Sequence, residues 1–111
     1  RGLGQVRRTH HVYAIELSPS VWAEAAFRRA NPQHQAGEPM AYVGATAHDP
    51  DVRFDQHMAG IRSNRFVRRH GVRLRMDWVD AVNPMTRSDA AYMEVDVALR
   101  LRALGWAVWQ A

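Results

Sequence analysis

A strand and a helix meet in the segment Met40-Ala41-Tyr42-Val43-Gly44-Ala45-Thr46-Ala47-His48-Asp49-Pro50, and the other elements can be placed around this junction. The apolar run Met40–Gly44 predicts a short, central strand. A helix is expected to begin next, because Asp49 is a typical N-cap residue and proline is favoured at the first helical position. The side chains that this helix is predicted to bury follow the spacing i, i+4 and i+7: Phe54, Met58 and Ile61.

Further strands are expected on both sides of this junction. Residues Val12–Leu17 are rich in β-branched and aromatic side chains, and Ser18-Pro19 follows them as a turn. The segment Gly71–Met76 alternates in polarity and predicts a half-buried strand with Arg73 and Arg75 on its outer face. Its inner face is predicted to carry Val72, Leu74 and Met76. The apolar segment Trp106–Trp109 is interpreted as a short final strand or as a tail packed on the core.

Three helical segments complete the expected fold. One, capped by Ser18 or Ser20, runs through Val21 to about Ala30, and another turn is expected within Ser63–His70. The longest opens at Thr86-Arg87-Ser88-Asp89 and continues to about Leu104, where Gly105 closes it. This order predicts a small α/β (α+β) sandwich with a three-stranded, mainly antiparallel sheet flanked by helices.

Length and composition predict one globular domain over residues 1–111. The 111 residues are 47% hydrophobic and 23% charged, which is ordinary for a chain with a single core. The absence of cysteine excludes disulfides, thiolate metal sites and a cysteine nucleophile. No apolar run approaches the roughly 18 residues of a membrane span, so we expect a cytoplasmic protein without a membrane partner. There is also no glycine-rich phosphate loop and no HExxH zinc motif.

The positive charge is concentrated in one part of the chain. All 15 cationic residues are arginine, and between Ile61 and Met76 there are six of them and no acid. A guanidinium group can donate two hydrogen bonds to one phosphate, so nucleic acid is the expected partner. The alternative is a solvated face whose arginines pair with acids brought close by the fold. The candidate DNA-binding residues are Arg62, Arg65, Arg68, Arg69, Arg73 and Arg75.

A carboxylate and an Arg–His pair stand out against the burial pattern. Glu94 is predicted to face inward on the last long helix, where a carboxylate needs a partner or a metal. Arg53 and His57 lie one helical turn apart at the edge of the Phe54 stripe. With strand tyrosines they could form a phosphodiester site. Alternatively, Glu94 and Arg53 form a buried ion pair and the tyrosines belong to the core.

Taken in order, these residues resemble the GIY-YIG nuclease family. Tyr13 matches the tyrosine that ends the first motif half, and Tyr42-Val43-Gly44 matches the second half. Arg53 follows Tyr42 by eleven residues, and the run from Arg53 to Gln56-His57 is similar to that of the structure-specific and restriction branches. Glu94 falls on the helix after the third predicted strand, where the family has its metal-binding glutamate. The resemblance spans residues 11 to 109.

The resemblance implies a single GIY-YIG-like nuclease domain that hydrolyses DNA with one Mg²⁺ or Mn²⁺ ion. Glu94 would ligate the metal, and Arg53 would hold the scissile phosphate. Tyr13 or Tyr42 would act as the base or orient the attacking water, while His57 would assist deprotonation.

The chain departs from the family pattern in four ways. His11 replaces the first glycine, a helix-sized insertion separates the two motif halves, Ala45 stands where many members have lysine, and no asparagine follows Glu94. These departures motivate an alternative, a catalytically weakened or inactive nucleic-acid-binding module on the same fold. A third interpretation is a protein-interaction domain that uses Trp106 and Trp109.

Overall fold

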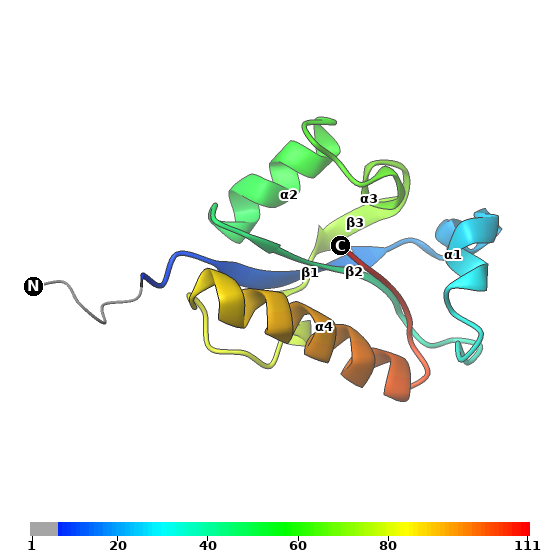
Figure 1. Cartoon of the computed structure of the whole chain (residues 1–111). Helices are drawn as coiled ribbons and strands as arrows, with labels where there is room; N and C mark the ends of the chain where they lie inside the picture. Colours follow the sequence, from blue (N-terminus) through cyan, green and yellow to red (C-terminus); the bar gives the residue numbers. More distant parts are fainter. Residues whose placement is uncertain (1–6) are drawn as a thin grey trace, which may run out of the picture.

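The computed structural model describes residues 7–111, which form a four-stranded sheet with helices on both of its faces (Figure 1). The strand order is β3-β1-β2-β4. Their bounds are His11–Leu17 for β1, Met40–Thr46 for β2, Gly71–Leu74 for β3 and Ala107–Gln110 for β4. Strand β1 is antiparallel to β2 and β3, whereas β4 is parallel to β2.

The α+β class is confirmed and the sheet is mainly antiparallel, but the expected count of three strands is wrong, since the sheet has four. The apolar tail becomes the fourth strand, and it pairs with β2 from Met40 to Val43. It runs parallel to β2 because the long helix α4 (Arg87–Ala103) returns the chain to the end where β2 begins. Ala107 and Val108 are fully buried as a result.

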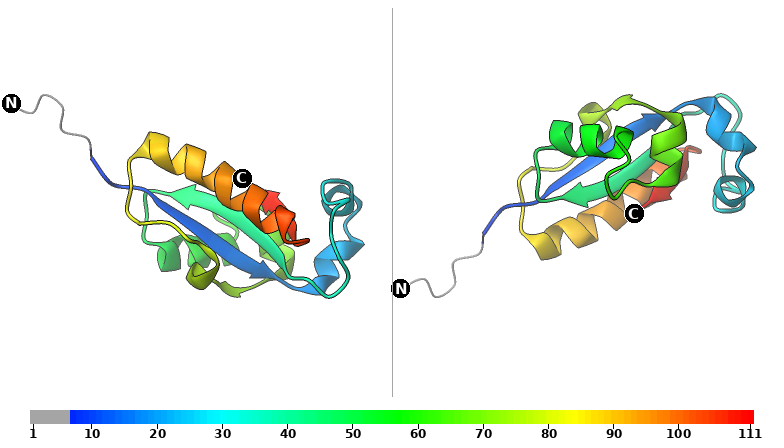
Figure 2. Two further views of the ribbon diagram at one scale, coloured as in Figure 1. Left: turned by 90° about the horizontal axis from the view of Figure 1, so that it is seen from below. Right: turned by 90° about the horizontal axis from the view of Figure 1, so that it is seen from above.

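The helices form a layer on each side of the sheet. Helix α4 covers one face, while α2 (Pro50–Met58) and α3 (Arg65–His70) cover the other (Figures 1 and 2). The 3-10 helix η1 (Pro19–Ala23) and α1 (Ala25–Arg29) lie at one end of the sheet, and η2 (Met76–Trp78) follows β3. Within residues 7–111, no helix combines the length and apolar character needed to cross a membrane.

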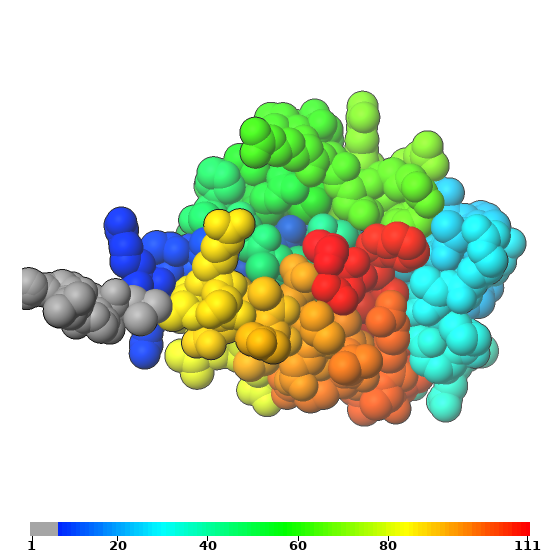
Figure 3. Space-filling view, in the orientation of Figure 1, coloured from blue at the N-terminus to red at the C-terminus, as the bar shows by residue number. Residues whose placement is uncertain are grey.

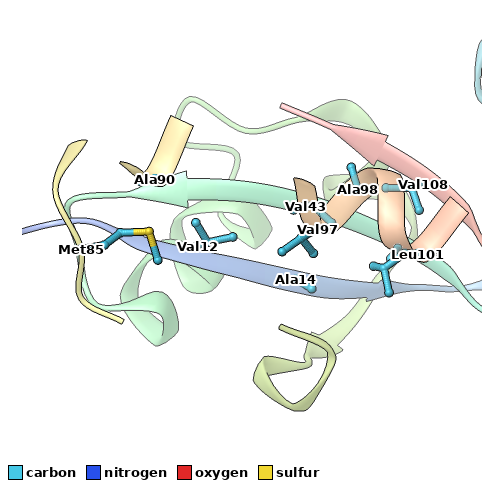
Figure 4. Close-up of a cluster of buried hydrophobic side chains, with 10 residues drawn as sticks. Val12, Ala14, Val43, Met85, Ala90, Val97, Ala98, Leu101 and Val108 are labelled. Carbon is cyan, nitrogen blue, oxygen red and sulfur yellow. The ribbon is translucent and has the colours of Figure 1, made fainter. Parts of the chain in front are cut away.

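Alternation along β1 divides the core into two clusters. Val12 and Ala14 point toward α4 and join a cluster of small aliphatic residues (Figure 4). Tyr13 and Ile15 point to the opposite face, where Tyr42 from β2 joins them. The two tyrosines of the candidate site therefore share the face covered by α2 and α3.

Three local expectations are corrected by the structure. The expected helix from Val21 to Ala30 is interrupted at Glu24, whose backbone is extended (ψ 115°). On α2, Met58 and Ile61 are 42% and 55% exposed, and the side chain buried there is His57. The helical spacing fails because α2 ends at Met58, so Ile61 lies in the following turn.

The third strand also differs from its alternating pattern. Strand β3 has only four residues at the edge of the sheet, and its pairing with β1 contains a register shift between Glu16 and Leu17. Val72 is 43% exposed rather than buried, and Met76 lies in η2. An edge strand this short gains little burial on its inner face.

Candidate functional site

The two tyrosines and His57 form a buried cluster beneath α2. The phenol oxygen of Tyr13 is 2.9 Å from Nε2 of His57. The ring of Tyr42 packs edge-to-face on the imidazole, with 5.3 Å between ring centroids, and lies 6.2 Å from the ring of Tyr13. All three side chains are nearly inaccessible to solvent, so their polar atoms depend on each other and on neighbouring groups.

Glycine at position 44 makes this cluster possible. Gly44 is the register partner of Tyr13, and a Cβ atom there would lie 2.7 Å from the Tyr13 phenol oxygen. The phenol therefore crosses directly over the backbone of β2. Sequence reasoning assigned no role to Gly44 beyond its place in the motif, although a glycine inside a strand is a known signal of close approach.

His57 is held as a neutral hydrogen-bond donor. The backbone N–H of Asn64 donates to its Nδ1 atom at 3.2 Å. A neutral imidazole has one N–H, so Nε2 carries the proton and donates it to the oxygen of Tyr13. Burial, reinforced by the charge of Arg53, lowers the pKa of His57 to about 4, which keeps this state at neutral pH. The role of Asn64 was missed because it depends on the fold of the α2–α3 turn.

The guanidinium group of Arg53 is fixed by the turn that follows α2. It donates to the carbonyl oxygens of Ile61 (3.1 Å) and Arg62 (2.8 Å) and to Oε1 of Gln56 (3.2 Å). Arg62 has a left-handed backbone (φ 46°) in this turn.

Burial raises the pKa of Tyr13 well above its usual range, with a contribution from Tyr42, whereas the nearby charge of Arg53 opposes this shift.

Glu94 reaches the same region from the opposite layer. Strand β4 pairs with β2 only as far as Val43, so within the described chain the end of β2 has no strand partner on that side. Glu94 of α4 lies beside this open edge, where its Oε2 accepts a 2.7 Å hydrogen bond from Gln110. Burial raises the pKa of the half-buried carboxyl group, and Gln110 and the Ala45 backbone oppose the shift. Sequence reasoning missed Gln110, whose contact depends on the unexpected fourth strand.

All five sequence-predicted site residues are brought to one region. Burial raises the pKa of Tyr42, the hydroxyl group of Tyr13 lowers it, the charge of Glu94 raises it and the charge of Arg53 lowers it, so both charged groups are close enough to act on Tyr42. Atoms of β1 and β2 are visible between the green α2 and the yellow-to-orange α4 in Figure 3. The alternative Glu94–Arg53 ion pair is not formed, and neither residue has an ion-pair partner within residues 7–111.

The side chains of the candidate site fit Mg²⁺ or Mn²⁺ better than they fit zinc. Nowhere in the described part of the chain do three or more His, Cys, Asp or Glu side chains gather as a metal-binding group. Zinc sites need three or four such protein ligands. Mg²⁺ retains several waters and is held through one or two carboxylates plus substrate phosphate oxygens. Glu94 is half-buried and forms no ion pair within residues 7–111. Its carboxylate therefore suits a divalent cation such as Mg²⁺ or Mn²⁺.

The six arginines predicted to bind DNA fall into two groups. Arg69 pairs with Glu24 at 3.2 Å, Arg73 pairs with Glu16 at 3.3 Å, and Arg75 pairs with both Glu16 and Asp77. For these three, acids brought close by the fold neutralise the charge, as the alternative interpretation expected. In the part of the chain that the structure describes, no ion pair is formed by Arg62, Arg65 or Arg68, which are all exposed.

Two other surface features lie outside this cluster. Trp106 and Trp109 pack edge-to-face on Trp78 and Phe66, with centroids 4.8 and 4.7 Å apart, so both rings are partly buried in the chain itself. A hollow of about 880 Å³ lies against the outer side of α4. Its lining is mostly apolar and includes Val82, Tyr92 and Leu99.

Comparison with known proteins gives no match for this chain. The chain matches no protein-family model, no curated protein and no solved structure.

Proposed function

We propose that this protein is a metal-dependent endonuclease of the GIY-YIG type, which hydrolyses DNA phosphodiester bonds with one Mg²⁺ or Mn²⁺ ion. The observation that supports it most is the meeting of Tyr13, Tyr42, Arg53, His57 and Glu94 from two strands and both helical layers without a Glu94–Arg53 ion pair. Residues that served only as a structural ion pair would be in contact, whereas Arg53 and Glu94 form no ion pair with each other although the charges of both act on Tyr42.

Each side chain has a distinct task in this proposal. Arg53, anchored by the α2–α3 turn, binds a non-bridging oxygen of the scissile phosphate and offsets its growing charge. Glu94 would hold the divalent cation, which would supply Lewis-acid stabilisation of the departing 3′ oxygen when bound. A water oxygen forms the new bond to phosphorus as the bond to the 3′ oxygen breaks.

The hydrogen bond between His57 and Tyr13 refines the acid–base assignment. Because the N–H of His57 donates to the phenol oxygen, it stabilises a phenolate at Tyr13 rather than removing the phenol proton. Tyr13 can therefore act as the base only after its own phenol proton has passed to solvent; the phenolate then accepts one proton from the attacking water, and Tyr42 orients that water. His57 is a positioning residue that tunes Tyr13.

The test compares Glu94→Gln with Asp96→Asn on the same helix. Glu94→Gln keeps the shape of the side chain but loses the charge, so we expect nicking of supercoiled plasmid in Mg²⁺ or Mn²⁺ to fall by about a hundredfold or more. Asp96, which pairs with Arg100 on the surface, is the matched control, and its variant should nick as the wild type does. Full activity of Glu94→Gln would refute the proposed nuclease.

A second candidate is a DNA-binding module without catalysis. The buried phenol of Tyr13 favours it, because its raised pKa leaves the phenol protonated at neutral pH in the chain alone. This candidate predicts DNA binding that weakens with salt and no cleavage in any divalent metal. Metal-dependent nicking that depends on Glu94 would exclude it.

A further inference from the structure

A cationic hollow lies next to the candidate site at the junction of α2 and α3. Its volume is about 430 Å³. It is lined by two residues of the connecting turn and three arginines of α3: Gly60, Ser63, Arg65, Arg68 and Arg69. Within the described chain, no acidic residue contributes to its lining.

The arginines of this hollow are not equivalent. Arg69 is bound to Glu24, so its charge is already compensated. The guanidinium of Arg65 lies 4.6 Å from the centre of the Phe66 ring, which supports one of its faces. Arg65 and Arg68 take part in no ion pair among residues 7–111, so they supply the uncompensated charge.

Gly60 lets Arg68 approach the turn closely. Its φ of +82° is in the left-handed region that favours glycine, and a Cβ there would lie 3.2 Å from Cζ of Arg68. The guanidinium group therefore rests against the turn backbone, which limits its freedom before any ligand arrives. A positioned guanidinium loses less entropy when it binds an anion.

The same turn connects the hollow to the candidate site. Its carbonyl groups at Ile61 and Arg62 hold Arg53, and Ser63 donates a 2.7 Å hydrogen bond to the carbonyl of His57. The turn that forms one wall of the hollow therefore also positions Arg53, the residue proposed to bind the scissile phosphate. A DNA strand held by Arg53 would pass close to Arg65 and Arg68.

We propose that this hollow is a second phosphate subsite, in which Arg65 and Arg68 bind a backbone phosphate of the DNA strand that flanks the scissile bond. This inference rests on the proposed function for its substrate. Of the six arginines on this surface, it assigns two to phosphate binding, three have charges paired within the fold (Arg69, Arg73 and Arg75), and Arg62 belongs to the turn that holds Arg53.

The experiment measures the binding of a short fluorescein-labelled DNA duplex by anisotropy in EDTA over a series of salt concentrations. Arg65→Ala with Arg68→Ala is compared with Arg28→Ala plus Arg29→Ala, which changes the net charge equally but lies in α1. Each phosphate contact contributes about 0.9 to the log–log salt slope, so the first double variant, which loses the one phosphate that Arg65 and Arg68 share, should lose about 0.9. The α1 double variant should keep the wild-type slope. Circular dichroism would establish that both are folded.

Two results would overturn the subsite. One is an unchanged slope in Arg65→Ala with Arg68→Ala, and the other is an equal loss of slope in both double variants. Because these measurements contain no metal, they are independent of catalysis. Failure of the nuclease would appear instead as cleavage that is absent in the wild type or unaffected by Glu94→Gln.

Discussion

The two faces of the sheet are built from different chemistry. Under α4, the buried side chains are almost all small and aliphatic, such as Val12, Val43 and Val97 (Figure 4). On the opposite face, the part of the core beneath α2 buries the side chains of His57, Tyr13 and Tyr42. Apolar burial is favourable by itself, whereas buried polar groups cost stability unless every one is hydrogen-bonded. The α4 face is therefore an ordinary aliphatic core, whereas the α2 face carries the buried polar cluster on which the proposed function depends.

The largest expected change in stability lies on the α4 face. Leu101 is 6% exposed in this cluster, and Leu101→Ala should lower the free energy of unfolding by about 2–5 kcal/mol because it leaves a cavity. Leu99→Ala, two residues away on the same helix and 58% exposed, should change it by less than about 0.5 kcal/mol. Urea unfolding would measure both. Equal costs for the two variants would contradict the packing of Leu101 in the aliphatic core beneath α4.

The buried His57 beneath α2 should make the free energy of unfolding depend on pH. The pKa of His57 is lowered from its ordinary value near 6.5 to about 4, so the unfolded chain binds a proton between these values that the folded chain does not. Unfolding free energy should therefore fall as the pH decreases from about 6.5 to 4, by up to about 3 kcal/mol from this residue.

Urea unfolding at pH 7, 5 and 4 would test this prediction. Part of the pH dependence should disappear in His57→Gln but persist in His48→Gln, whose side chain is exposed. If His57→Gln retained the full loss of stability between pH 6.5 and 4, His57 would not be the neutral donor to Tyr13.

The local signals in the sequence predicted the ends of elements well. Asp49 and Pro50 begin α2 as expected, with Oδ1 of Asp49 accepting from the N–H of Asp51. Thr86 caps α4, and Gly105 follows its end with a φ of +85°. These signals work because capping depends on atoms within a few residues of one another.

Features that depend on distant residues were not predictable in the same way. The parallel pairing of β4 with β2 joins residues more than sixty positions apart, and the ion pairs of Arg69 and Arg73 join residues 45 and 57 positions apart. Helical periodicity also placed Met58 and Ile61 inward, but Met58 lies on the exposed side of α2 and Ile61 lies beyond its end. The five site residues were selected by their order along the chain, and only the fold brings them together.

The smallest expected change in unfolding free energy comes from Gly44 of β2, which pairs with Tyr13 of β1. In Gly44→Ala, the new Cβ would lie 2.7 Å from the Tyr13 phenol oxygen, so the phenol must move away from His57. We expect a loss of about 1–3 kcal/mol in unfolding free energy from overpacking, together with a loss of nicking activity.

Gly37→Ala is the control, because Gly37 has a φ of +88° but no atom of residues 7–111 would lie within 4 Å of a Cβ added there. It should lose about 1 kcal/mol from backbone strain and keep its activity. Plasmid nicking and urea unfolding of the two variants separate crowding at Tyr13 from the general cost of replacing a glycine. Activity that survived Gly44→Ala while Tyr13 was displaced would remove Tyr13 from the proposed chemistry and leave Tyr42 as the tyrosine that acts on the water.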